Sequence, residues 1–201
     1  MTRLTRVFPL LVLLATTAGC GLLDRKPEGP STSGDEPEWR QRALAIEDLV
    51  DYTQTQPDLL DPQHQEGTIQ YQVLPPPGGP HNPVWLNCQG DIYDAEVPNE
   101  HAVHSLEHGA VWITYHPSLP ADQVAALANR VRGNDKMFMS PFPTLDTPIS
   151  LQAWGYQLKL DWADDPRVDE FIRALRINAG REPQAPCSGG VSATGSVPVA
   201  P

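Results

Sequence analysis

Apolar residues recur every three to four positions in several segments of the chain, a spacing that predicts amphipathic helices. The clearest case is 118–133, where an apolar stripe lies between a proline close to the expected N-cap and a final glycine. A shorter helix is expected to begin at Glu100 and to stop before Gly109. The predicted helices cover residues 37–54, 100–108, 118–133 and 166–177.

Other segments alternate apolar and polar residues or are continuously apolar, as strands do. The segment "GTIQYQVLPPP" alternates Ile69, Tyr71 and Val73 with polar residues, which is typical of a half-buried strand. Residues 75–100 are too rich in proline and glycine to hold regular structure throughout, so we expect a long loop there. The predicted strands cover residues 67–77, 110–115, 136–142 and 149–160.

After residue 109, these elements follow one another as strand, helix, strand, strand, helix. This order predicts an α+β fold in a single compact domain, with helices packed on a small mixed or antiparallel sheet. It also indicates split βαβ character. We place the globular domain at residues 38–187 and expect the polar segment 188–201 to be a disordered tail.

The N-terminal segment has the layout of a secretory signal, with Arg3 and Arg6 before an apolar run and small residues leading to Cys20. The last four residues, "TAGC", resemble a bacterial lipobox, in which the cysteine becomes the lipidated first residue of the mature protein. We therefore expect a signal peptide at 1–19 and a flexible tether at 20–37. The protein would then be lipid-anchored and extracytoplasmic, on the outer face of the cell membrane.

The chain is acidic, with a formal net charge of −11 at pH 7. Removing residues 1–19 takes away two arginines and leaves 12 Lys plus Arg against 25 Asp plus Glu, a balance of −13. A nucleic-acid-binding surface would be basic, so no nucleic-acid partner is expected. This negative charge is compatible with a soluble domain that an anionic membrane surface repels, or with a domain that weakly attracts cations.

Two cysteines remain if Cys20 carries the lipid. Cys88 and Cys187 would then lie in a compartment where disulfides form. We expect them to pair and to tether the C-terminal region to the middle of the domain. The alternative is that Cys88 is a thiolate ligand of a metal ion, which would leave Cys187 without a role.

Three of the six histidines lie within the predicted helix at 100–108. On a helix that turns about 100° per residue, His101, His104 and His108 fall within a sector of about 60°, nearly opposite the apolar residues. Side chains three and four positions apart are neighbours, so these imidazoles can converge on one ion. Glu107 can serve as a further ligand or fix an imidazole tautomer. The sequence therefore predicts a transition-metal site, with a solvated polar face as the alternative.

Further ligands can come from outside this helix. His81, in the loop rich in proline and glycine, is the best candidate. Met137 and Met139 alternate along a predicted strand, and their thioethers would favour copper, although two core methionines are the simpler interpretation. Imidazole suits copper and zinc alike, so copper is our first choice and zinc the second.

The residues "HSLEH" at 104–108 also match the H-x-x-E-H pattern of inverzincin peptidases. In those enzymes the two histidines hold zinc, the glutamate, here Glu107, activates water, and a downstream acid such as Glu170 or Glu182 completes the site. The predicted helix ends directly after the motif, and the domain leaves little room for a peptidase cleft. An enzyme is therefore less favoured than a binding protein.

A third interpretation is an interaction module that works without metal and binds a protein partner that the sequence does not identify. Glu107 and the histidines would then be internal hydrogen-bonding groups that shape the long loop, since buried polar side chains usually find partners within the protein.

The segment "GPHNPVWLNCQGDIYDAEVPNEHAVHSLEHGAVWITY", followed by "SPFP" and "AWG", resembles a family of secreted or membrane-anchored bacterial proteins catalogued as domain of unknown function 3105. The resemblance covers roughly residues 65–190 and implies an extracytoplasmic location without an activity. Met137 and Met139 lie outside the family's pattern, which weakens the argument for copper. The resemblance gives weight to the residues at the family's motif positions, His81, His104, Glu107 and His108, over His101 and His116.

Overall fold

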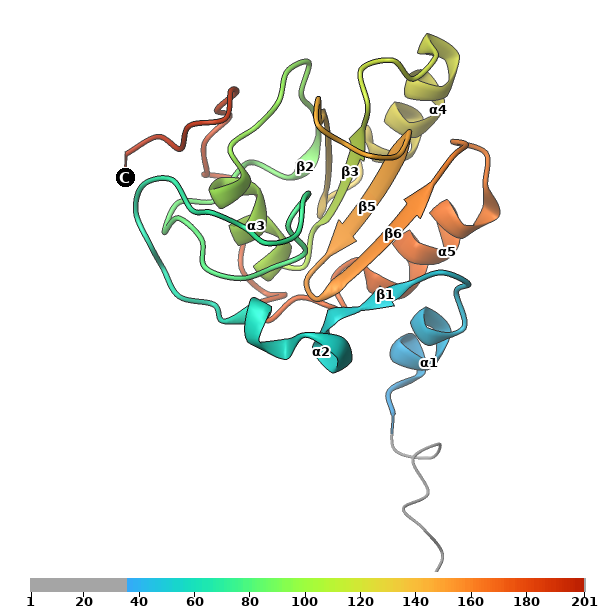
Figure 1. Cartoon of the computed structure of the whole chain (residues 1–201), viewed down its shortest axis with the longest axis horizontal. Coiled ribbons are helices and arrows are strands. Elements are labelled where there is room, and N and C mark those ends of the chain that lie inside the picture. The colour runs from blue at the N-terminus through green and yellow to red at the C-terminus, as the bar shows by residue number, and fades with distance from the viewer. Residues whose placement is uncertain (1–35, 201) are drawn as a thin grey trace, which may run out of the picture. The chain divides into compact units, whose positions relative to one another are not determined.

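The continuously apolar segments of the sequence form the centre of a six-stranded mixed sheet (Figure 1). The computed structural model describes residues 36–200; the predicted signal peptide, Cys20 and nearly all of the tether lie outside the described residues. The order across the sheet is β1-β6-β5-β3-β4-β2. The strands are β1 (Val50–Asp51), β2 (Gln89–Ile92), β3 (Val111–Tyr115), β4 (Met137–Pro141), β5 (Ile149–Ala153) and β6 (Tyr156–Leu160).

The connections confirm the expected α+β fold. β3 and β4 are parallel neighbours joined by α4 (Ala121–Val131), while β5 and β6 form an antiparallel hairpin beside β3. β2 also pairs in parallel with β4, on the side away from β3, and α3 (Asn99–Glu107) connects β2 to β3. Because β4 lies between β2 and β3, this unit is a split βαβ arrangement.

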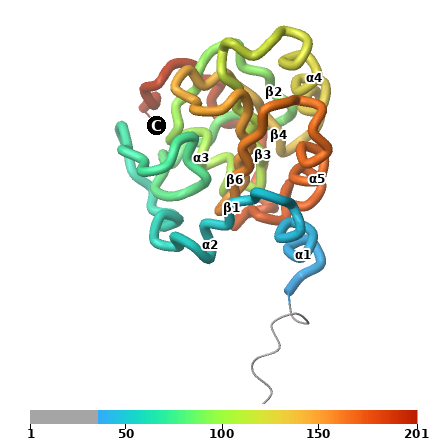
Figure 2. The backbone as a smooth tube through the Cα atoms, turned by 45° about the vertical axis from the view of Figure 1, so that its right-hand side comes forward, coloured from blue at the N-terminus to red at the C-terminus, as the bar shows by residue number. Residues whose placement is uncertain are grey.

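Both faces of the sheet are covered, which explains why its central strands are apolar throughout. Val111 and Ile113 of β3 belong to one buried cluster, together with apolar residues of α4 and α5 (Pro166–Leu175). Trp112, between them in sequence, belongs to a second cluster with Ala102 and Leu106 of α3. Figures 1 and 2 show α4 and α5 on one side of the strands and α3 on the other. The two clusters are the two cores that alternating side chains create.

The predicted helix at 37–54 is wrong in length. α1 (Glu38–Leu44) ends early, and the backbone turns at Asp48, which has a positive φ of 63°. β1 then pairs with the exposed side of β6, and Asp51 caps the short α2 (Tyr52–Thr55) by accepting a hydrogen bond from the Thr53 amide. Ala43 and Ile46, which the apolar spacing placed on the inner face, are buried as expected. After residue 49 the chain pairs with β6 and does not continue as a helix.

The predicted strand at 67–77 is also wrong, because this segment pairs with no strand among the described residues. The alternation in the sequence still matches the burial of the side chains: Ile69, Tyr71 and Val73 are half-buried, and the residues between them are exposed. The Ile69 amide donates to the Glu100 carboxylate at 2.7 Å instead of to a neighbouring strand. The three prolines that follow cannot donate backbone hydrogen bonds at all.

The long loop is confirmed, although it contains β2 and follows a 3₁₀ helix, η1 (Pro57–Leu60). The segment from η1 to residue 98, which includes this loop, covers the face of α3 that points away from the sheet (Figure 1). We call this segment the loop layer. Residues 188–200, which we expected to be a disordered tail, lie against this layer through hydrogen bonds of Val191 to Trp85 and of Gly195 to Glu96. Within residues 36–200, no helix has the length and hydropathy that crossing a membrane requires.

Candidate metal centre

α3 lies between the sheet and the loop layer, so its polar side chains are buried as well as its apolar ones. Every residue from Glu100 to Glu107 is buried. Ala102, Val103 and Leu106 pack toward the sheet, as their predicted position opposite the histidines requires. The imidazoles and Glu107 therefore face the loop layer and not open solvent.

Four side chains meet where α3 contacts this layer. His64, His81, His104 and Glu107 each offer one ligand atom, and these atoms all lie within 4.8 Å of one another. The ring centroids are 4.8 Å apart for His81 and His104, and His64 is 5.0 and 5.1 Å from these two rings. Three separate segments of the chain thus bring together a group that could hold a metal ion.

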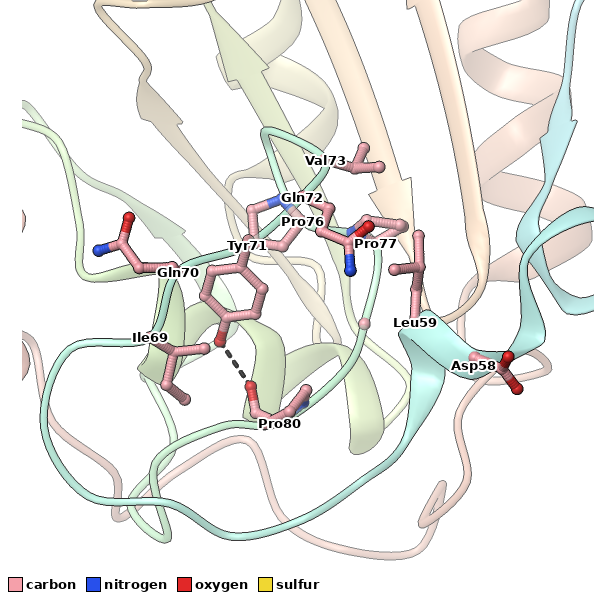
Figure 3. A pocket seen from close by; sticks show the side chains of 11 residues that line it. Asp58, Leu59, Ile69, Gln70, Tyr71, Gln72, Val73, Pro76, Pro77 and Pro80 are labelled. Atoms are coloured by element: carbon pink, nitrogen blue, oxygen red, sulfur yellow. Dashed lines mark hydrogen bonds between the residues drawn. The ribbon is translucent and has the colours of Figure 1, made fainter.

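The backbone places His64 beside His81. The two residues form an isolated parallel bridge, in which the Gln65 amide donates to the His81 carbonyl at 2.7 Å and the His81 amide donates to the Gln63 carbonyl at 2.9 Å. The loop between them is further held by the Tyr71 hydroxyl, which donates to the Pro80 carbonyl at 2.6 Å (Figure 3). Burial, followed by the nearby Glu100, raises the pKa of Tyr71, so the phenol stays protonated as a donor.

Backbone carbonyls fix the tautomers of two of these rings. Nδ1 of His81 lies 2.8 Å from the Gly79 carbonyl, and Nδ1 of His104 lies 2.7 Å from the Asn82 carbonyl. A carbonyl only accepts hydrogen bonds, so each Nδ1 carries the proton and a neutral ring keeps a free electron pair on Nε2. This is how histidine ligands are usually oriented in metal sites.

The pKa shifts keep the cluster ready to bind a cation. Burial lowers the pKa of His104 to about 4, and the neighbouring imidazoles add to this, so the ring is neutral at pH 7. Burial alone would raise the pKa of Glu107, but His81, His104 and Arg181 outweigh it and the pKa lies below its ordinary value. The group therefore presents a carboxylate beside uncharged imidazole, the protonation states that metal ligands need.

The contact between His81 and Glu107 is unusual. Nε2 of His81 lies 3.0 Å from Oε2 of Glu107, which is a hydrogen-bonding distance. However, this fully buried Nε2 has no hydrogen-bond partner among residues 36–200, so the contact does not have the geometry of a hydrogen bond. A neutral ring with its proton on Nδ1 has no proton on Nε2 to donate, and the contact then places two electron-rich atoms side by side.

The structure brings only part of the predicted ligand set together. His81, His104 and Glu107 belong to the group, whereas His108 does not. The His108 ring is 4.6 Å from that of His104, and its Nδ1 lies 2.9 Å from the Pro186 carbonyl, which anchors the ring to the C-terminal segment. His101 uses both ring nitrogens elsewhere, on the Val84 carbonyl and on the Val199 amide.

The predicted thioether ligands lie on the other side of the sheet. Met137 and Met139 are buried in the cluster that α4 and α5 form, whereas their neighbour Phe138 is in the cluster of α3. They are core residues, which was the simpler interpretation of their spacing. His116 is half-buried, and its Nδ1 forms a hydrogen bond with the Ser118 hydroxyl.

The predicted disulfide between Cys88 and Cys187 is confirmed, so Cys88 as a thiolate ligand is wrong. The bond holds the C-terminal segment beside α3. Lys136 adds to this, because its buried ammonium group donates to the carbonyls of both His108 and Ala185. The His108 side chain and the end of α3 are thereby fixed to this segment.

The peptidase interpretation requires both histidines of the "HSLEH" motif on one ion and the glutamate free to activate water. The structure places Glu107 in the ligand group with His104 and leaves His108 outside it. Glu170 lies on α5, where it lines a separate pocket together with Arg173 of α5 and Arg42 of α1. These positions do not reproduce the arrangement that the motif needs.

His64 and Arg181 were not predicted as site residues from the sequence. His64 stands alone in the polar segment "DPQHQEG", whose composition gives no signal, and only the pairing with His81 brings it to the cluster. Arg181 follows α5, and its Nε lies 3.4 Å from Oε1 of Glu107. Both residues are exposed, so patterns of burial could not have singled them out.

The fold and this cluster define an α+β protein with a candidate metal centre of three histidines and one glutamate. The chain belongs to the family described as Protein of unknown function (DUF3105), whose model matches residues 63–189. That range contains all four candidate ligands and both cysteines of the disulfide. Comparison with curated proteins and with solved structures gave no match.

Proposed function

We propose that this protein binds one divalent transition-metal ion through His64, His81, His104 and Glu107. The observation that carries the proposal is the buried Nε2 of His81, which has no hydrogen-bond partner among the described residues although it lies 3.0 Å from Oε2 of Glu107. With Nδ1 protonated, both atoms are electron-rich, and a positive ion between them and the nearby imidazoles relieves their repulsion.

The distances suit such a site. Zinc lies about 2.0–2.1 Å from imidazole nitrogen and carboxylate oxygen, so neighbouring ligands of a tetrahedral ion are about 3.3 Å apart. The four candidate atoms lie within 4.8 Å of one another. The buried ligands are held by α3 and backbone carbonyls, and the exposed His64 ring is free to close the remaining distance.

Nitrogen and oxygen donors favour copper(II) or zinc and offer nothing specific to copper(I), because the methionine thioethers lie elsewhere. At one set of such ligands copper(II) binds more tightly than zinc. Copper(II) is therefore our first proposal and zinc the second.

The test is metal content after stripping with a chelator and reloading. We expect about one equivalent of copper or zinc per chain, and almost none in the double variant His104→Ala with His108→Ala, because His104 is a central ligand. The control is His116→Ala, which removes a half-buried imidazole outside the cluster. Unchanged stoichiometry in the double variant, with its fold checked by circular dichroism, would exclude this site.

The 3.0 Å contact also favours one rival, an interaction module in which a protonated His81 simply pairs with Glu107. In that case the group is structural and the protein acts through a partner. The same measurement separates the two proposals, since the rival predicts no stoichiometric metal in the wild-type protein.

We also propose that the protein is lipid-anchored at Cys20 and faces the outside of the cell membrane. The signal-like segment ending at Cys20 supports this, and so does the Cys88–Cys187 disulfide, which needs an oxidising compartment. Cell fractionation is expected to find the wild-type protein with membranes and the Cys20→Ser variant released from them. Equal membrane retention of both would argue against the anchor.

A further inference from the structure

Arg181 stands beside the cluster because its chain segment crosses the end of α3. The Ile177 amide donates to the Gly109 carbonyl at 2.7 Å, and the Glu182 amide donates to the Glu107 carbonyl at 2.9 Å. Gly180 packs so closely here that an added Cβ would lie 2.5 Å from the Gly109 Cα. The segment has no room to shift, so Arg181 is held next to Glu107.

The guanidinium group of Arg181 is positioned on two sides. Its Nε lies 3.4 Å from Oε1 of Glu107, and its central carbon lies 6.0 Å from the centre of the Trp154 ring. The Trp154 ring in turn meets His81 edge to face, with centroids 5.8 Å apart. The planar guanidinium fork of arginine is rigid, so it loses little freedom for each hydrogen bond that it forms with a ligand.

Neutralising Glu107 does not account for this placement. A charge-assisted hydrogen bond between arginine and carboxylate is typically about 2.7–2.9 Å long, and the 3.4 Å contact is longer. The two terminal nitrogens of Arg181 have no partner within the part of the chain that the structure describes, and the side chain is 52% exposed.

Exposure to solvent differs among the four candidate ligands and Arg181. His81, His104 and Glu107 are 0%, 4% and 5% exposed, so the protein closes the site around them. His64 and Arg181 are the two exposed members of this group of five. These two side chains, an imidazole and a guanidinium group, are therefore the ones that a ligand from solvent would meet first.

We infer that the metal centre takes a small carboxylate from solvent, with one carboxylate oxygen on the metal ion and the other on Arg181. This inference rests on the proposed function. A carboxylate has the flat two-oxygen shape that the guanidinium fork matches, and its negative charge suits both the cation and the arginine. Arg181 thereby sets the preference for carboxylates over anions that offer a single donor atom.

The test uses the copper(II)-loaded protein, whose visible absorption reports ligands entering at the metal, titrated with acetate or with chloride. Arg181→Lys keeps the charge and removes the fork, so we expect acetate to bind about tenfold more weakly. Chloride, a single atom that needs only the ion and the charge, is expected to bind as before. Arg173→Gln, which removes an exposed arginine on α5, is the matched control and leaves both affinities unchanged.

The outcomes are distinct. Equal loss of acetate and chloride binding, or no change in acetate binding, would overturn the role of Arg181, and so would a wild-type spectrum that acetate does not change. Metal content measured first on each sample separates these results from failure of the metal site itself, because a protein without copper shows no visible band to titrate.

Discussion

Removing the Cys88–Cys187 disulfide is expected to lower the free energy of unfolding by about 4 kcal/mol. The two cysteines are 99 residues apart in sequence, and a cross-link of that length strongly restricts the unfolded chain. The effect is large for a domain of this size, whose total stability is typically about 5–15 kcal/mol. The midpoint of thermal unfolding is expected to fall by roughly 10 °C.

Urea unfolding of the oxidised and the reduced wild-type protein measures this effect without changing the sequence. The double variant Cys88→Ser with Cys187→Ser is expected to behave like the reduced protein, with a further small loss because both positions are buried. If oxidised and reduced protein unfold at the same urea concentration, the bond does not stabilise the domain.

Metal binding is expected to stabilise the domain by a similar amount. An ion that binds only the folded protein, present at about 1,000 times its dissociation constant, adds about 4 kcal/mol. The ligands come from three segments, so the ion fastens the loop between His64 and His81 to α3. Metal-free protein is therefore expected to melt roughly 10 °C lower than loaded protein.

Two single variants test this expectation: Glu107→Gln changes a ligand, and His116→Ala serves as the control. Glu107→Gln keeps the size of the side chain but removes the charge, so most of the metal-dependent rise in melting temperature is expected to disappear. His116→Ala lies outside the cluster and is expected to keep it. A rise of the same size in wild type and Glu107→Gln would show that the ion binds elsewhere.

Much of the fold follows from the sequence because single elements decide their own structure. The run Val111–Tyr115 is apolar enough to be a buried strand in any context, and the helix before it stops at Gly109, whose φ is 89°. The segment after α1 differs, since its apolar spacing fits a longer helix equally well. Residues 50 and 51 form a strand because they pair with the edge of β6, which comes much later in the chain.

From the sequence, only those ligands of the site that lie on a single helix can be placed next to one another. His104 and Glu107 lie one turn apart on α3, and spacing alone places them together. Spacing alone does not choose between Glu107 and His108 as the second ligand on the helix, because the segment that anchors the His108 ring, at Pro186, lies far along the chain. His64 depends on a backbone bridge to His81, and no periodicity in the sequence records that contact.

The most direct test is therefore the metal affinity of His64→Ala compared with that of His108→Ala. Removing an exposed ligand such as His64 leaves the fold intact, and we expect the affinity to fall by at least about 100-fold, beyond the 10- to 100-fold that losing a supporting partner costs. His108→Ala is expected to keep about one equivalent with an affinity close to wild type. Retained affinity in His64→Ala together with lost affinity in His108→Ala would contradict the proposed ligand set.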